Sequence, residues 1–348
     1  MSIFRSLIRK EVLHLLRDPR TVTVVLVMPV VLLLLFGFAI STEVNSVRLL
    51  AVVGQHTDET HRLLERFRSN PYFTLEGIVA PHEADDLLRQ GKADAVLVLR
   101  TDDGQLTHQV ITDASNTNLA QTATAYIESV VSGESSSPVV LHTLYNPQLK
   151  SAYQFVPGIM GMIFILICSM MTSVSIVSER ESGTMDLLLV SPVRPRTIIL
   201  GKLVPYFLLS CLLLGLMLTL SYTVLGLPFS PSALHVVWLS LLYIILALGL
   251  GMLVSTLVAT QVAALLVSGM LFMVPVTMLS GMIFPVENMP VALQGVSCLI
   301  PARWYISALR VLMIQQLPVR HILPQTAVLA LMTLVVLTLA AKKFNLRK

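Results

Sequence analysis

Residues 178–192 read SERESGTMDLLLVSP, a short charged segment between two long apolar runs at 156–177 and 200–225. Each run is long enough to cross the hydrocarbon core of a bilayer, which takes about 20 residues of helix. The charged segment must therefore turn the chain at one face of the membrane. Its alternating charges, its Gly-Thr pair, a second apolar patch and a closing proline predict a small helix that contacts another molecule.

The composition indicates an integral membrane protein. Of the 348 residues, 55% are hydrophobic and 13% are charged, whereas soluble domains average about 25% charged; the mean hydropathy is +0.77. The net charge of +4 is small, and Lys and Arg gather beside apolar runs, so they indicate membrane orientation and no nucleic-acid partner. The three cysteines have neither paired nor metal-ligand spacing, so no disulfide framework and no metal site are expected.

Six apolar runs predict an all-α membrane fold with six transmembrane helices. They lie at 21–40, 156–177, 200–225, 236–257, 262–284 and 322–341. The first run has a competing interpretation as a signal peptide, but its length and the long leader before it favour an uncleaved anchor. The fifth run contains Pro275, which we expect to be a hinge or a passive kink.

Two other stretches are expected to lie at the membrane without crossing it. Residues 1–20 form an amphipathic pattern with Arg and Lys off the apolar face, which predicts a helix in the interface; an ordinary cytosolic helix is the alternative. Residues 285–317 are too many for a turn and too mixed for a span, so they predict a re-entrant or interfacial hairpin on the extracytoplasmic side. The middle of this hairpin reads Pro301-Ala302-Arg303-Trp304-Tyr305, with aromatic side chains suited to the headgroup level.

Residues 41–155 have the composition of a soluble domain inserted between the first two spans. Strands are expected at 48–53, 74–79, 95–99, 108–112 and 139–144, and helices at 58–68, 82–90 and 116–131. This alternation predicts a small α/β domain with a core of its own. Its histidines are scattered without metal-ligand spacing, so they are expected on the solvated surface.

The distribution of Lys and Arg predicts the topology. These residues gather in the leader, around the loop at 178–199 and in the tail at 342–348, whereas the turn at 226–231 has none. Six spans put all three basic regions on one side, which the positive-inside rule makes the cytoplasm. Both termini and the charged segment at 178–192 are therefore expected in the cytoplasm, and the α/β domain is expected outside.

The chain lacks the sequence features of several other membrane machines. The interiors of the six runs carry no Asp, Glu, Lys, Arg or His, and His235 lies only at an edge. Ion-coupled carriers and intramembrane proteases normally need such groups at depth, although backbone carbonyls can bind sodium. The Gly-Lys pairs at 91–92 and 201–202 do not fit a phosphate-binding loop, so energy for uphill transport would have to come from another subunit.

The charged segment at 178–192 resembles the cytoplasmic signature of type-2 ABC transporter permeases. The resemblance is carried by ERESGTMDLL at 179–188, by Ser-Pro at 191–192 and by Gly-Lys-Leu at 201–203. Lys-Glu at 10–11 and Arg-Asp-Pro-Arg at 17–20 are similar to the connecting helix of that family, and the segments 279–285, 289–290 and 300–305 resemble its last extracytoplasmic hairpin. The match extends over nearly the whole chain, and the large domain after the first span is similar to the bacterial multidrug-efflux-like branch.

This resemblance implies the membrane subunit of an exporter in the bacterial cytoplasmic (inner) membrane. Such permeases pair as homodimers or heterodimers and bind two cytosolic ABC ATPase subunits, which hold the ATP and Mg, so this chain binds no cofactor itself. In Gram-negative relatives a periplasmic adaptor and an outer-membrane channel can complete the path. The loop between spans two and three is the coupling helix, and the implied contact residues are Glu179, Arg180, Glu181, Gly183, Thr184, Met185 and Asp186.

The expected substrate is a hydrophobic or amphipathic, drug-like molecule. Methionines in the second span would suit such molecules, but Met and Leu also face lipid in any helical bundle. Two other functions stay open: an ion-coupled secondary carrier, and a membrane sensor whose outside domain binds a ligand. A sensor would need a cytoplasmic output domain, and the sequence offers only short loops and a short tail on that side.

Overall fold

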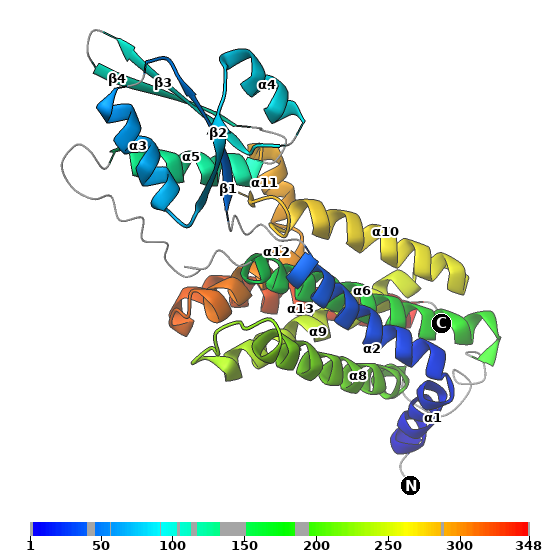
Figure 1. Cartoon of the computed structure of the whole chain (residues 1–348). Helices are drawn as coiled ribbons and strands as arrows, with labels where there is room; N and C mark the ends of the chain where they lie inside the picture. Colours follow the sequence, from blue (N-terminus) through cyan, green and yellow to red (C-terminus); the bar gives the residue numbers. More distant parts are fainter. Residues whose placement is uncertain are drawn as a thin grey trace. The chain divides into compact units, whose positions relative to one another are not determined.

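The computed structural model describes residues 3–39, 46–55, 57–90, 92–102, 105–112, 117–132, 151–184, 195–286 and 289–346. The chain forms two compact units (Figure 1). One unit contains Met1–Ile40 and Ser151–Lys348, and the other is Ser41–Lys150.

The first unit is a bundle of long apolar helices. These helices are α6 (Ser151–Glu181), α8 (Pro195–Thr223), α9 (Ala233–Ser255), α10 (Gln261–Leu279) and α13 (Leu323–Leu346). Each is long and apolar enough to cross a membrane, α13 together with the short η4 (Val319–Ile322) before it. The last five expected runs therefore form helices of the length that a bilayer requires.

Two further helix pairs in the bundle are sharply bent. α1 (Ile3–Arg17) meets α2 (Pro19–Leu34) and its continuation η1 (Leu35–Ala39) at 67°, and α1 ends at the residue before Asp18-Pro19. α11 (Val291–Ser297) meets α12 (Pro301–Leu309) and its continuation η3 (Arg310–Ile314) at 89°. By length and composition, the described residues thus contain five spans, or up to seven if each bent pair counts as one.

Several helix ends differ from the sequence-based boundaries. α6 extends to Glu181 and α8 begins at Pro195, so both helices reach into the loop expected at 178–199. α10 ends at Leu279 and not at residue 284, because Gly281 follows with a positive φ of 82° that a right-handed helix cannot contain. Apolar composition does not report such a break, since the residues beyond it remain hydrophobic.

The core of the bundle is a close contact of α6 with α9 and α12. Gly251 of α9 lies against the backbone of α6, where an added Cβ would be 2.7 Å from the Cα of Ser169. The rings of Tyr243 on α9 and Tyr305 on α12 stack at 4.1 Å with an interplanar angle of 4°, and both side chains are fully buried. The Tyr243 hydroxyl donates to the Gly161 carbonyl oxygen at 2.9 Å. The stacked tyrosine rings place α12 in the core of the bundle.

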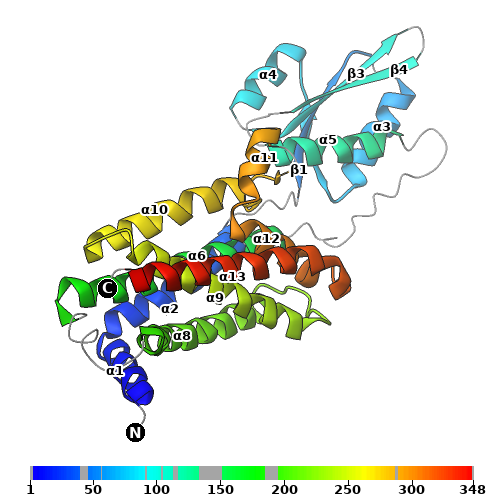
Figure 2. The same ribbon diagram turned by 180° about the vertical axis from the view of Figure 1, so that it is seen from behind.

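Different helix ends meet at the two ends of the bundle. α1, the end of α6 and the end of α13 lie together at one end in both ribbon views (Figures 1 and 2). At the other end, η1 finishes beside the start of α6, and the ring centroids of Phe36 and Phe155 are 6.2 Å apart. The chain thus leaves the bundle and re-enters it at the same end.

The second unit is a four-stranded sheet covered by helices. The strands are β1 (Val47–Val53), β2 (Phe73–Ile78), β3 (Ala95–Asp102) and β4 (Gln105–Thr112), in the order β2-β1-β3-β4. β1 pairs in parallel with β2 and β3, and β3 pairs with β4 in antiparallel fashion. The helices are α3 (Asp58–Ser69), α4 (Pro81–Arg89) and α5 (Thr117–Ser132). The strand expected at 139–144 lies outside the described residues.

Each face of this sheet has its own core. Leu49 and Ala51 of β1 pack with Phe67 of α3 and Ile127 of α5 on one face, whereas Leu50 packs with the α4 side on the other. This alternation is the period-2 pattern of a strand covered on both sides. At the start of β1, Arg48 Nη2 lies 2.7 Å from Asp94 Oδ1. The hydrogen bond to this carboxylate and its negative charge raise the pKa of Arg48.

Candidate functional site

The charged segment at 178–192 begins as the last turn of α6. Ser178–Glu181 continue this 31-residue helix, and Gly183 follows with a φ of +73°. Gly183 is therefore not inside a helix, and most of the small helix expected from the sequence, residues 185–192, lies outside the described residues. A left-handed conformation ends a right-handed helix and favours glycine there, so Gly183 stops α6 at no steric cost. Met185 and Asp186, also expected at this site, lie outside the described residues.

Glu179 lies in a buried ion cluster between three helices. Its carboxylate oxygens are 2.6 Å from Lys10 Nζ of α1 and 3.0 Å from Lys202 Nζ of α8. Lys202 Nζ also lies 3.4 Å from the Glu11 carboxylate and donates to the Ser175 carbonyl oxygen at 3.3 Å. The side chains of Lys202 and Glu11 are only 6% and 7% exposed. Two ammonium groups face two carboxylates, so the cluster is formally neutral, as a buried group of charges must nearly be.

Arg180 contacts the end of α9. Its guanidinium Nη1 donates to the Ser255 carbonyl oxygen at 2.9 Å and to that of Val258 at 3.4 Å. Ser255 is the last residue of α9, so the cation lies at the negative end of the helix dipole, which it stabilises.

Glu181 contacts the start of α10. Its carboxylate Oε2 accepts a hydrogen bond from the backbone N–H of Gln261 at 2.9 Å. Gln261 is the first residue of α10, and Thr260 before it accepts from the Ala263 N–H as the N-cap. The first N–H groups of a helix lack partners within the helix, and an anion there also matches the dipole. Arg180 and Glu181 together bracket the turn between α9 and α10.

The exposed part of the segment begins at Glu181 and continues into the turn after it. Ser182, Gly183 and Thr184 are all exposed. The Thr184 hydroxyl donates to the Glu179 carbonyl oxygen at 3.2 Å, and the Ser182 and Thr184 hydroxyls lie 3.1 Å apart. The turn is therefore fastened to the end of α6 while its outer surface stays open.

The Pro301–Tyr305 motif forms the corner between α11 and α12. Pro301 is the first residue of α12, and Ala302 behind it is fully buried. Arg303 Nη1 donates to the Gln294 carbonyl oxygen at 2.9 Å and also contacts Ser297, and its guanidinium lies 5.3 Å from the Trp304 ring. Trp304 Nε1 donates to the Cys298 carbonyl oxygen at 3.0 Å. The motif thus closes the corner on one side and places Tyr305 in the bundle core on the other.

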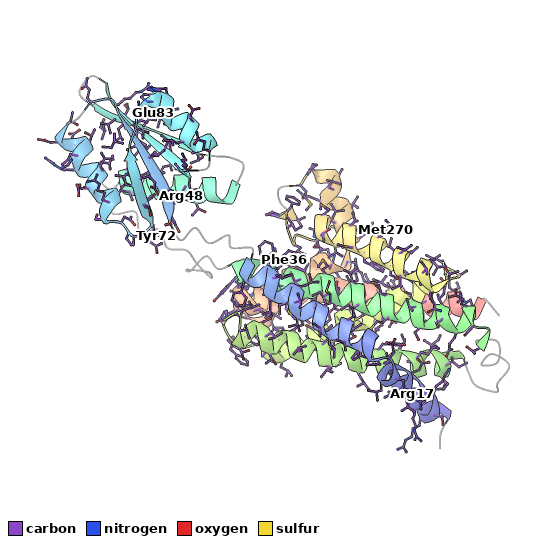
Figure 3. The ribbon with its side chains drawn as sticks, turned by 45° about the vertical axis from the view of Figure 1, so that its right-hand side comes forward. Arg17, Phe36, Arg48, Tyr72, Glu83 and Met270 are labelled. Atoms are coloured by element: carbon purple, nitrogen blue, oxygen red, sulfur yellow. The ribbon has the colours of Figure 1, made fainter. Side chains whose placement is uncertain are left out.

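Pro275 lies within the continuous helix α10. It borders an apolar groove of about 440 Å³ together with Phe272, Leu299, Leu331 and Val335. α10 exposes apolar side chains along its length; Met270, labelled in Figure 3, is 73% exposed. Among the described residues, no group of His, Cys, Asp and Glu side chains could hold a metal ion.

The charged turn is evident in the sequence, but the partners of its side chains are not. Lys10, Glu11 and Lys202 were assigned to orientation or to the resemblance, and the structure joins them to Glu179 in one cluster. The only signal in the sequence was a Lys-Glu pair in an amphipathic leader and a lysine at the start of an apolar run. Neither shows which helices meet.

Comparison with known proteins relates the sequence of this chain to transporters. Residues 19–342 match the family described as ABC-2 family transporter protein. The chain is 29% identical over 327 residues to the probable multidrug ABC transporter permease YbhS of Escherichia coli K12, covering 88% of this chain and 87% of that protein. It is 30% identical over 320 residues to YbhR, a probable multidrug ABC transporter permease of the same organism, covering 86% of each. It is also 25% identical over 149 residues to the linearmycin resistance permease protein LnrN of Bacillus subtilis, covering 43% of this chain and 38% of that protein.

Proposed function

The chain belongs to the ABC-2 transporter family, and from this premise we propose that it is the membrane subunit of an ATP-driven exporter in the bacterial inner membrane. One observation carries the proposal: the residues 179–181 join the end of α6 to α1, α8, α9 and α10. An exporter that takes its energy from another subunit needs a single point at which movement reaches many helices. The end of α6 has the contacts for that role.

ATP is hydrolysed on a separate subunit that holds its own Mg. The support is the sequence of this chain, which has no phosphate-binding loop. That partner docks at the coupling segment, for which Glu179, Arg180, Glu181, Gly183, Thr184, Met185 and Asp186 are the residues assigned from the family resemblance.

The topology follows from Lys and Arg. The basic leader, the coupling segment and the end of α13 face the cytoplasm, and they share one end of the bundle (Figures 1 and 2). Residues 41–155 and the hairpin at 285–317 face outside. Two permeases form the transport unit, and a periplasmic adaptor with an outer-membrane channel completes the path outward.

The substrate is hydrophobic or amphipathic and enters from the cytoplasm or the inner membrane. The relatives YbhS and YbhR are named as probable multidrug permeases. The apolar groove beside Pro275 and the exposed apolar face of α10 suit a substrate that partitions into lipid.

The decisive experiment reconstitutes the permease with its co-purifying ATPase in liposomes and follows a fluorescent amphipathic dye. We expect dye transport that requires ATP and stops when the catalytic carboxylate of the ATPase is neutralised. Dye transport that follows an imposed proton or sodium gradient without ATP would instead support the ion-coupled carrier. A chain that binds no ATPase and moves no dye contradicts the exporter proposal.

A further inference from the structure

We propose that Glu179, Arg180 and Glu181 are internal braces and that the exposed turn Ser182–Thr184 makes the docking contact. The braces carry movement of this turn into four other helices. This inference rests on the proposed exporter function and changes which residues of the coupling segment face the ATPase. It assigns the three charged side chains a positioning role within the permease itself.

The first brace is Glu179, whose carboxylate is committed to its own chain. Its side chain is 12% exposed, and it lies between Lys10 and Lys202. Lys202 is buried between Glu179 and Glu11, and Lys10 supplies the second cation, so that no buried charge is left uncompensated. Little of the Glu179 side chain is therefore accessible to the ATPase, whereas α1 and α8 both contact it.

α1 and α8 are close enough at this point to move as one body. An added Cβ on Gly201 of α8 would lie 3.0 Å from the Cβ of Leu7 on α1. Such tight packing transmits displacement, because packed interiors have low compressibility. A shift of the end of α6 therefore acts on both helices through Glu179.

The second and third braces are Arg180 and Glu181, which contact main-chain atoms. Arg180 donates to the carbonyl oxygen of Ser255 at the end of α9, and Glu181 accepts from the N–H of Gln261 at the start of α10. A main-chain atom in a helix terminus moves only with its helix, unlike the tip of a long side chain. The signs also match the helix dipoles, with the cation at a C-terminus and the anion at an N-terminus.

The turn that remains for docking is rigidly attached and sterically open. Ser182 and Thr184 both hydrogen-bond to the Glu179 carbonyl oxygen, at 3.3 and 3.2 Å. Among the residues that the structure describes, none has an atom within 4 Å of a Cβ built on Gly183. A partner can therefore approach the backbone of this turn, and a push on it reaches α6 without loss in a flexible linker.

The test separates docking from coupling with Glu181→Ala and Thr184→Trp. In nanodiscs, Glu181→Ala should bind the co-purified ATPase as the native chain does but should transport several-fold less dye per ATP, because the hydrogen bond from Gln261 N–H is lost. Thr184→Trp should weaken ATPase binding by about tenfold or more, as obstruction of a central contact does. Glu181→Gln, which keeps an acceptor for Gln261 N–H, should recover much of the coupling.

Two results would contradict the proposed positioning role of Glu181. If Glu181→Ala weakens ATPase binding as much as Thr184→Trp does, Glu181 is a docking residue. If it changes neither binding nor coupling, it braces nothing.

A measurement on the permease alone keeps the inference independent of the exporter proposal. Hydrogen exchange at the first amides of α10 should rise by about tenfold or more in Glu181→Ala, because the acceptor of Gln261 N–H is lost. Unchanged exchange there contradicts the brace even if no ATPase is found. If the native chain binds no ATPase while Glu181→Ala still raises the exchange, only the exporter proposal is contradicted.

Discussion

Among single residues, Lys202 is a buried charge that depends on its ion-pair partners. It lies at the start of a span, it is almost fully buried, and its ammonium group faces the carboxylates of Glu11 and Glu179. Removing one member of such a group leaves a charge without compensation in a medium of low dielectric. Lys10 belongs to the same cluster but is 53% exposed, so water can replace it. The two lysines thus form a natural comparison.

Lys202→Met should destabilise the bundle by about 3–5 kcal/mol, because Glu11 then loses its cation inside the protein. Thermal unfolding of the detergent-solubilised protein measures the change. Lys10→Met is the matched control and should cost less than about 1 kcal/mol, as exposed pairs do. Lys202→Met combined with Glu11→Gln should recover stability, since Lys10 still compensates Glu179. Equal losses in the two lysine variants would contradict the buried cluster.

Among elements, the crossing of α6 and α9 depends on a missing side chain. Gly251 lets α9 approach the backbone of α6 at Ser169, and small residues allow such close approach in membrane bundles. Ser173 of α6 also lies 2.9 Å from Ser268 of α10 through the hydroxyl oxygens, and both are fully buried. α6 is therefore held by α9 and α10 along its length, which makes it a stiff connection between the two ends of the bundle.

Gly251→Ala should destabilise the bundle by about 1–3 kcal/mol, because the new methyl group meets backbone atoms of Ser169 that cannot rotate away. Gly269→Ala on α10 is the control, since no atom of the described part of the chain lies within 4 Å of its Cβ position. That variant should be neutral or slightly stabilising, as alanine is the better helix former. Both are compared by thermal unfolding in one detergent. A milder effect at Gly251 than at Gly269 would show that the two helices are farther apart.

The corner between α11 and α12 is a second element with its own requirement. Arg303→Ala removes the contacts to the end of α11 and should loosen the corner by about 1.5–3 kcal/mol, the value of a charged hydrogen bond. Hydrogen exchange over α11 reports the loosening. Arg320→Ala, at an exposed arginine after the hairpin, is the control and should leave α11 unchanged. Protection of α11 that stays at the native level in Arg303→Ala would argue against this role.

For the whole molecule, the topology can be tested by labelling. In a variant without the three cysteines, Ser182→Cys should react with an impermeant maleimide only in inverted vesicles, and Glu83→Cys only in spheroplasts. Both positions are exposed, and Figure 3 labels Glu83 on α4 of the second unit. The basic segments beside the bundle end at Ser182 favour the cytoplasm for that end. Labelling of both cysteines from one side would contradict the proposed orientation.

Much of the architecture could be predicted because it rests on local properties. Long apolar stretches are visible in the sequence wherever they pack, so five expected runs correspond to α6, α8, α9, α10 and α13. Short strand-like stretches bounded by turn residues likewise located β1 to β4, since these signals are local in the sequence. Helix ends were less predictable. The stop of α6 at Gly183 and of α10 before Gly281 depends on backbone angles that hydrophobicity does not encode.

The sequence by itself therefore determined the class of protein, the order of its helices and strands, and the charged turn between two spans. Only the tertiary structure decided what that turn does with its charges. Glu179, Arg180 and Glu181 are consecutive, yet they reach α1 and α8, the end of α9 and the start of α10 respectively. Side chains at the end of a helix point in different directions around its axis, and which helix lies in each direction is a property of the packed bundle.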